Sequence, residues 1–78
     1  MLSDGMYVRL NIAPNTRMGT ISQCTLEAGK VRFIFHHDPR FHDTTPDIYL
    51  FDYDVEPCER PSDAEVDRIN ELIQRGGA

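Results

Sequence analysis

The sequence predicts a mainly β domain with one C-terminal helix, built as a small five-stranded β-barrel or β-roll. Three observations favour this fold. Residues 18–35 have the pattern of a β-hairpin, shorter strand-like runs flank them, and apolar residues at helical spacing occur near the C-terminal end. With 78 residues, of which 40% are hydrophobic and 27% charged, the chain has the composition of one globular domain around a single core.

The first predicted strand covers residues 6–10, where every second residue is apolar, because a strand alternates its side chains between two faces. Residues 11–17 contain proline and asparagine, which favour a turn and end this strand. Gly19 opens the next strand at a position where the chain needs a bend or a close approach of two backbones.

The hairpin of residues 18–35 is predicted to turn at residues 27–30, where Gly29 can adopt a positive φ at little cost. Its second arm is rich in β-branched and aromatic residues, which favour strands. Phe33 and Phe35 share one face of this arm, so we expect them to fill the core.

The first arm of the hairpin breaks its own alternation, because Ile21 is out of phase with Cys24 and Leu26. This pattern predicts a β-bulge or a strong bend near residues 22–23. In the second arm Ile34 faces away from the core, so it needs a cover of its own.

The segment after the hairpin predicts a loop and two short strands. Residues 36–47 contain two prolines and many charged or titratable side chains, which indicates a long loop. Residues 48–51 predict a fourth strand and residues 52–54 a single helical turn. Residues 55–57 predict an edge strand, because proline cannot donate a hydrogen bond inside a sheet.

A helix is predicted over residues 62–75. Ser62 and Glu65 have the spacing of a capping box, and two glycines follow at residues 76–77 to end the helix. Its apolar stripe consists of Val66, Ile69, Leu72 and Ile73. The simplest surface for this stripe is the Ile34 side of the hairpin, and the alternative is the mouth of the barrel.

Charge is unevenly distributed along the chain. Residues 1–35 contain four basic and two acidic side chains, whereas residues 36–78 contain four basic and eleven acidic ones. The net charge of −5 repels a phosphate backbone and disfavours general nucleic-acid binding, although the basic half is sufficient for a local contact.

The two cysteines, Cys24 and Cys58, do not form a disulfide framework, and the sequence has no pattern of an export signal. We therefore expect reduced thiols. No apolar run approaches the ~18–20 residues of a membrane span. These features predict a cytoplasmic protein with no membrane contact.

Short motifs give the chain a resemblance to the SH3-like barrels of the Tudor and KOW type. The matching residues are Val8-Arg9-Leu10, Gly19-Thr20-Ile21, Gly29, Val31-Arg32-Phe33 and Asp54-Val55-Glu56-Pro57. The resemblance covers residues 6–57, so it implies one domain over residues 1–78 in which a five-stranded SH3-like barrel precedes the helix of residues 62–75. It also implies a binding module without chemistry.

Tudor-like barrels hold methylated lysine or arginine in an aromatic cage, so the resemblance draws attention to the rings of this chain. They are Tyr7, Phe33, Phe35, Phe41, Tyr49, Phe51 and Tyr53. In a domain of this size the phenylalanines serve first as core. KOW-type barrels contact RNA, and the corresponding residues would be Arg9, Arg17, Lys30 and Arg32 with Tyr7.

Histidines and carboxylates gather in the loop after the hairpin, namely His36, His37, Asp38, His42 and Asp43. Such groups suit zinc or another first-row metal. Adjacent histidines point in opposite directions at a strand end, however, and no second pair at ligand spacing follows. We therefore expect solvated histidines, with no metal and no cofactor.

A hydrolytic site would require His37 and Asp43 to meet Ser22 or Cys24, and no nucleophile motif surrounds either residue. We therefore expect that the chain is not an enzyme.

An acidic stretch runs from the fourth predicted strand to the helix, and it favours contact with a basic surface of a partner. The function predicted from the sequence is a non-enzymatic adaptor that binds a protein, with Asp52, Asp54 and Glu56 as the contact surface. The candidate binding residues are Tyr7, Phe41, Tyr49, Asp52, Tyr53, Asp54 and Glu56. The alternatives are a KOW-like module for RNA or single-stranded nucleic acid and a small acidic inhibitor, of the kind carried by phages, that occupies a basic nucleic-acid site.

Overall fold

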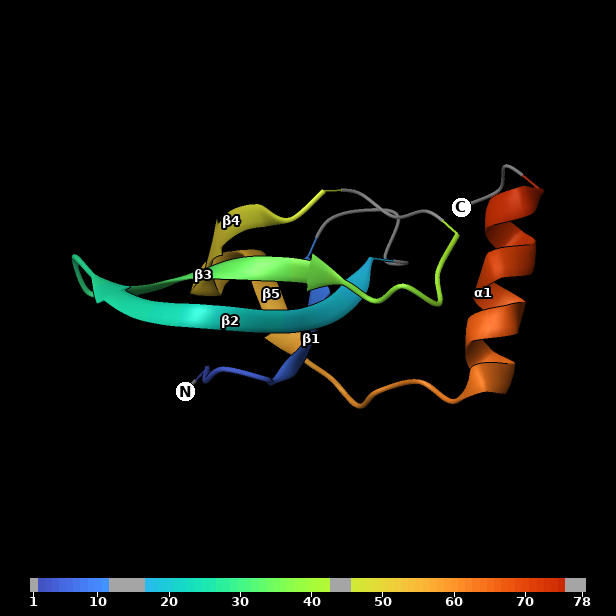
Figure 1. Cartoon of the computed structure of the whole chain (residues 1–78), viewed down its shortest axis with the longest axis horizontal. Helices are drawn as coiled ribbons and strands as arrows, with labels where there is room; N and C mark the ends of the chain where they lie inside the picture. The colour runs from blue at the N-terminus through green and yellow to red at the C-terminus, as the bar shows by residue number, and fades with distance from the viewer. Residues whose placement is uncertain (1, 12–16, 43–45, 76–78) are drawn as a thin grey trace.

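The computed structural model describes residues 2–11, 17–42 and 46–75, and within them five antiparallel strands form one sheet beside a C-terminal helix (Figure 1). This confirms the predicted mainly β fold with one helix. The elements are β1 Tyr7–Leu10, β2 Met18–Glu27, β3 Lys30–His37, β4 Ile48–Phe51, the 3₁₀ turn η1 Asp52–Asp54, β5 Val55–Pro57 and α1 Asp63–Gln74. The strand order is β4-β3-β2-β1-β5, so the last strand returns to pair with the first.

The two longest strands of the sheet, β2 and β3, form the predicted hairpin, and both its predicted turn and its predicted bulge are present. Its turn consists of Ala28 and Gly29, with φ angles of 52° and 78°, which is the two-residue loop whose twist matches that of the strands. The register shifts between Ser22 and Thr25, and Gln23 has a φ of 54°. The predicted bulge is therefore confirmed.

Gly19 lies where β2 meets the end of β3, opposite His37. A Cβ atom at this position would overlap the backbone carbonyl oxygen of His36. The predicted close approach of two backbones is therefore confirmed, and only glycine allows it without a shift of the strands.

The sheet has β4 and β5 at its two edges. β5 contains Pro57, as the prediction of an edge strand required. Between these strands the η1 turn is held by Asp54, whose Oδ2 accepts a hydrogen bond of 2.9 Å from the Phe51 backbone N–H.

Apolar side chains form two clusters. The first lies inside the curved sheet and consists of Val8, Leu10, Ile21, Phe33, Phe35 and Val55. It contains both phenylalanines that the hairpin pattern assigned to the core, and each of them is 1% exposed. The second cluster, at the end of the sheet nearest the helix, consists of Met18, Phe41 and Val66.

Helix α1 begins after Ser62, whose Oγ accepts a hydrogen bond of 3.2 Å from the Glu65 backbone N–H. Its buried Val66 packs with Phe41 in the second cluster, so the helix does not cover Ile34. The prediction of the Ile34 side was wrong, because the helix packs on Phe41, which comes from the loop after β3. Figure 1 shows helix α1 beyond one end of the sheet. Leu72 of the predicted stripe is 47% exposed.

The predicted end of the helix at residues 76–77 lies outside the described residues. Among the described residues, no helix combines the length and the apolar character that crossing a membrane requires.

Candidate functional site

The side of β2, β3 and β4 that faces away from the core forms one continuous surface, which we call the outer face. It carries Ser22, Arg32, Ile34, His36, Tyr49 and Phe51. The register places Ile34 between Ser22 on β2 and Tyr49 on β4, and it places Arg32 beside Phe51. Directly paired residues of neighbouring strands share a face, so these side chains are neighbours.

Aromatic rings and cations occupy the β4 part of the outer face. The Tyr53 ring, from η1, stacks on Phe51 with 5.5 Å between centroids and 4° between planes. The Arg32 guanidinium lies 4.3 Å from the Tyr49 ring centroid, and the Lys30 ammonium lies 5.2 Å from that of Tyr53. Tyr49 is 63% exposed and Tyr53 60% exposed, so this part of the sheet offers large rings to a partner.

The structure brings Tyr49 and Tyr53, two of the candidate residues, to this surface. It does not build a cage there, because Phe51 and Tyr53 are parallel rather than at an angle and cations of the chain itself lie over Tyr49 and Tyr53.

The three carboxylates predicted to contact a partner, those of Asp52, Asp54 and Glu56, each contact another group of the same chain. Asp52 Oδ2 accepts a hydrogen bond of 3.1 Å from the Val31 backbone N–H, and Asp54 holds the η1 turn. Glu56 forms an ion pair with Arg9 across β5 and β1. Arg9 therefore offsets the charge of Glu56, whereas Asp52 and Asp54 keep their charge and use one carboxylate oxygen each within the chain.

The other two candidate residues lie apart from the outer face, near helix α1. Phe41 is 1% exposed in the second cluster, so its ring serves as core. Tyr7 is half-buried beside the same cluster, and its hydroxyl donates a hydrogen bond of 2.8 Å to Asp38 Oδ2. Burial and the neighbouring carboxylate raise the pKa of Tyr7.

Asp38 is the centre of a buried polar network that the sequence did not predict. Its carboxylate is 3% exposed and accepts hydrogen bonds from Tyr7 and from the backbone and guanidinium of Arg40, at 2.8–3.2 Å. Arg40 also pairs with Asp63 on α1 at 2.8 Å. Burial raises the pKa of Asp38, but the hydrogen bonds from Arg40 and Tyr7 outweigh burial and lower that pKa to about 2.

Asn70 of α1 extends this network to the loop after β3. Its side chain donates to the Arg40 carbonyl oxygen at 2.9 Å and accepts from the His42 backbone N–H at 2.8 Å. Asp38 and Asn70 together tie the loop and the helix to β1, so the network is structural.

The three histidines lie in different places: β3 extends through His36 and His37, which the sequence assigned to the loop, and His42 lies in the loop after β3. His36 Nδ1 lies 2.8 Å from Asp47 Oδ2 and its Nε2 lies 2.6 Å from Ser22 Oγ. The His37 ring packs on Phe35 with centroids 5.7 Å apart, and His42 is exposed beside Gln74. Among the described residues, no group of three or more His, Cys, Asp or Glu side chains could hold a metal ion, and the predicted Asp43 lies outside them.

Both cysteines are free thiols. Burial and the neighbouring Asp4 raise the pKa of Cys24 to about 11, and burial raises that of Cys58. Neither thiol is therefore a ready nucleophile at neutral pH.

The basic residues of the predicted nucleic-acid site do not gather in one place. Arg9 pairs with Met18 at the start of β2, whereas Lys30 pairs with Glu27 at its end, roughly 30 Å away along the strand. Lys30 and Arg32 alone lie beside the exposed rings.

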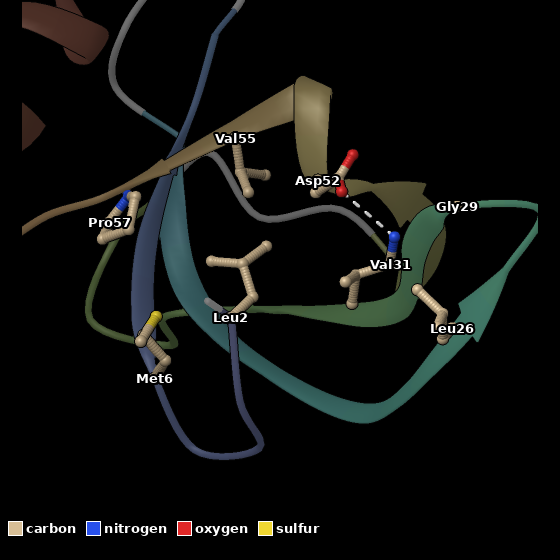
Figure 2. A pocket seen from close by; sticks show the side chains of 8 residues that line it. All are labelled: Leu2, Met6, Leu26, Gly29, Val31, Asp52, Val55 and Pro57. Carbon is tan, nitrogen blue, oxygen red and sulfur yellow. Dashed lines mark hydrogen bonds between the residues drawn. The ribbon is translucent and has the colours of Figure 1, made fainter.

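An apolar cavity of about 420 Å³ lies between the N-terminal segment, β5 and the hairpin (Figure 2). It is lined by Leu2, Met6, Leu26, Gly29, Val31, Asp52, Val55 and Pro57. A smaller cavity of about 150 Å³ shares Leu2, Leu26 and Val31 with it. Figure 2 shows the Asp52 carboxylate bound to the Val31 backbone at the rim.

No protein-family model, curated protein or solved structure matches this chain.

Proposed function

We propose that this chain is a binding module that contacts a protein partner through the outer face, with Tyr49 and Tyr53 as its main contacts. The observation that carries this proposal is the exposure of both rings, 63% for Tyr49 on β4 and 60% for Tyr53 in the adjoining turn η1. Tyrosine and arginine are enriched among residues that dominate binding energy, and Arg32 lies against Tyr49. Rings held by neighbouring cations lose little conformational entropy on binding.

The strand order supports the resemblance to SH3-like barrels of the Tudor and KOW type as part of this proposal. The resemblance implies a barrel of five strands, and five strands are present here, the last of which pairs with the first after the η1 turn. A cytoplasmic location also belongs to the proposal, since free thiols persist in a reducing compartment.

Quantitative affinity capture from nuclease-treated lysate tests the contact surface. We expect the paired variant Tyr49→Ala/Tyr53→Ala to retain the partner at least tenfold less than the unmodified chain. Leu72→Ala on helix α1 is the matched control, because Leu72 is an exposed apolar residue far from the outer face. The variant Asp52→Asn/Glu56→Gln tests the acidic surface predicted from the sequence. Equal capture by the tyrosine variant and the control would remove the outer face as the contact.

A second candidate function is binding of single-stranded nucleic acid. It is favoured by one observation, the position of Lys30 and Arg32 beside exposed rings, which suits base stacking with phosphate contacts. A labelled single-stranded RNA should then shift at low salt, and the affinity should fall steeply as salt increases. No shift at low salt would end this alternative. The acidic inhibitor stays a prediction.

A further inference from the structure

The side chains of Ser22, His36 and Asp47 are linked by two consecutive hydrogen bonds on the outer face. The distance from Ser22 Oγ to His36 Nε2 is 2.6 Å, and that from His36 Nδ1 to Asp47 Oδ2 is 2.8 Å. An ionised carboxylate only accepts hydrogen bonds, so in the neutral ring the proton lies on Nδ1. Nε2 then has its lone pair directed at the Ser22 hydroxyl.

We propose that Ser22 is a nucleophile for activated acyl donors, with His36 as its general base and Asp47 as the residue that positions the imidazole. A serine, a histidine base and a carboxylate that fixes the tautomer are the parts that nucleophilic acyl transfer requires. This proposal goes beyond binding, and it departs from the expectation that the chain is not an enzyme. It does not depend on the identity of a binding partner.

Regular pairing of β2 with β3 places Ser22 next to the base, because Thr20 lies opposite His36 and Ser22 lies opposite Ile34. The register pairs Ser22 with Ile34 and resumes only at Thr25, and Gln23 has a positive φ between them. The bulge therefore begins directly after the proposed nucleophile, and bulges are common next to active sites. His36 lies one step along the same face of β3 from Ile34, so its ring reaches Ser22 diagonally.

An acyl donor can reach the hydrogen-bonded side chains of Ser22, His36 and Asp47 from solvent. The side chains of His36 and Asp47 are 37% and 57% exposed, respectively. Ile34 and Tyr49 continue the row that begins with Ser22, so they offer an apolar surface for the acyl group.

The proposed step transfers one proton and one acyl group. Ser22 Oγ attacks the carbonyl carbon of an ester while its proton moves to His36 Nε2, and the tetrahedral intermediate carries the negative charge on the former carbonyl oxygen. The bond to the leaving alkoxide then breaks, and His36 returns the proton to it. Water hydrolyses the acyl-serine by the same proton path, releasing a carboxylic acid.

The backbone near Ser22 restricts the substrate to donors with good leaving groups. The backbone N–H of Cys24, which follows the bulge after Ser22, donates a hydrogen bond of 2.9 Å to Asp4 Oδ1. This amide is therefore engaged within the chain and does not serve as a donor of an oxyanion hole, which normally supplies a large part of the catalysis of unactivated esters. We expect reaction with aryl esters and with phosphonofluoridates.

A fluorophosphonate probe tests the proposal directly. Ser22 Oγ forms a bond to phosphorus, the bond to fluorine breaks, and fluoride leaves while His36 takes the proton. We expect the full chain to gain one adduct by intact mass, mapped to Ser22, at a rate at least 100-fold above that of Ser62, because a positioned base contributes 10²–10⁴-fold. Ser62 serves as the internal control, since its hydroxyl only caps helix α1.

Variants separate catalysis from structure. His36→Gln should lower Ser22 labelling by at least 100-fold, whereas His42→Gln, the same change at an exposed histidine, should leave it unchanged. Asp47→Ala should lower labelling about tenfold and shift the His36 tautomer toward Nε2–H in ¹⁵N NMR spectra, which loss of a merely structural contact would not do. Circular dichroism checks the fold of each variant. Equal labelling of Ser22 and Ser62, or unchanged Ser22 labelling in folded His36→Gln, would overturn the proposal.

Discussion

Asp38 is a buried charge whose removal should destabilise the fold more than any exposed carboxylate. It accepts hydrogen bonds from Tyr7 and Arg40, and Asp38→Asn leaves both donors without their charged acceptor. We expect a loss of about 2–4 kcal/mol in the free energy of unfolding at pH 7, measured by urea denaturation. Asp63→Asn is the control, because the Asp63 side chain is 90% exposed and loss of its ion pair with Arg40 should cost about 0.5 kcal/mol or less.

The same carboxylate makes stability depend on pH in one direction. The pKa of Asp38 is lowered from 3.8 to about 2 by its hydrogen bonds, which outweigh burial. A lowered folded-state pKa contributes stability that is present above the unfolded-state pKa and is lost as pH falls through the folded-state value. The stability gap between the unmodified chain and Asp38→Asn should therefore narrow from pH 4 to pH 2. A constant gap over this range would contradict the assignment.

Gly19 and Gly29 should respond differently to the same substitution. Gly19→Ala places a Cβ on the carbonyl oxygen of His36, so two strands must separate, and we expect a loss of about 3 kcal/mol. Gly29→Ala meets no atom within 4 Å but has a φ of +78°, which costs about 1 kcal/mol. Thermal denaturation of both variants compares how far each substitution destabilises the fold. A similar destabilisation by Gly19→Ala and Gly29→Ala would argue against the close approach of the Gly19 and His36 backbones.

At the scale of elements, the hairpin turn can be improved. Ala28 has a φ of 52° in a two-residue loop where asparagine before glycine is favoured. Ala28→Asn should therefore stabilise the chain by about 0.5–1 kcal/mol, read from the urea midpoint at constant slope. The same substitution at Ala64, an exposed position in helix α1, should destabilise instead, because asparagine is a weaker helix former than alanine. If Ala28→Asn destabilised the chain, the turn would not be the two-residue loop with positive φ that favours asparagine before glycine.

The sequence predicted the hairpin and its bulge because Ile21 and Cys24 differ in phase, and a strand tolerates such a break only by inserting a residue. It predicted the start of helix α1 because a cap is a local pattern of Ser62 and Glu65. It did not predict where the helix packs. Phe41, which decides this, lies in a loop without periodicity, so no pattern marks it as core.

The candidate site was less predictable for a related reason. Ser22, His36 and Asp47 are 14 and 11 residues apart, and only the strand register brings them together. A shift of the β2–β3 register by one residue would have turned Ser22 to the other face. The exposed rings of Tyr49 and Tyr53 were named from the sequence, whereas the internal contacts of Asp52, Asp54 and Glu56 depend on backbone positions that residue types do not reveal.

At the scale of the whole molecule, two separate apolar clusters stabilise the domain. The molecule is elongated, 41 × 20 × 18 Å, with the hairpin turn and helix α1 at its two ends (Figure 1). The larger cluster lies in the sheet, and the helix is held by Val66 and Phe41 together with the polar network of Asp38 and Asn70. Fewer apolar groups therefore hold the helix than hold the strands.

This division predicts that helix α1 opens before the sheet unfolds. Elements held by few buried contacts exchange their amide hydrogens through local opening at free energies below that of global unfolding. In native-state hydrogen exchange we expect the amides of α1 to open at a free energy at least about 1–2 kcal/mol below those of β2 and β3. Val66→Ala should lower the value for α1 and leave that of the strands nearly unchanged, because Val66 packs only in the second cluster. Equal opening free energies in the helix and the strands would instead show that the polar network couples the two clusters into one cooperative unit.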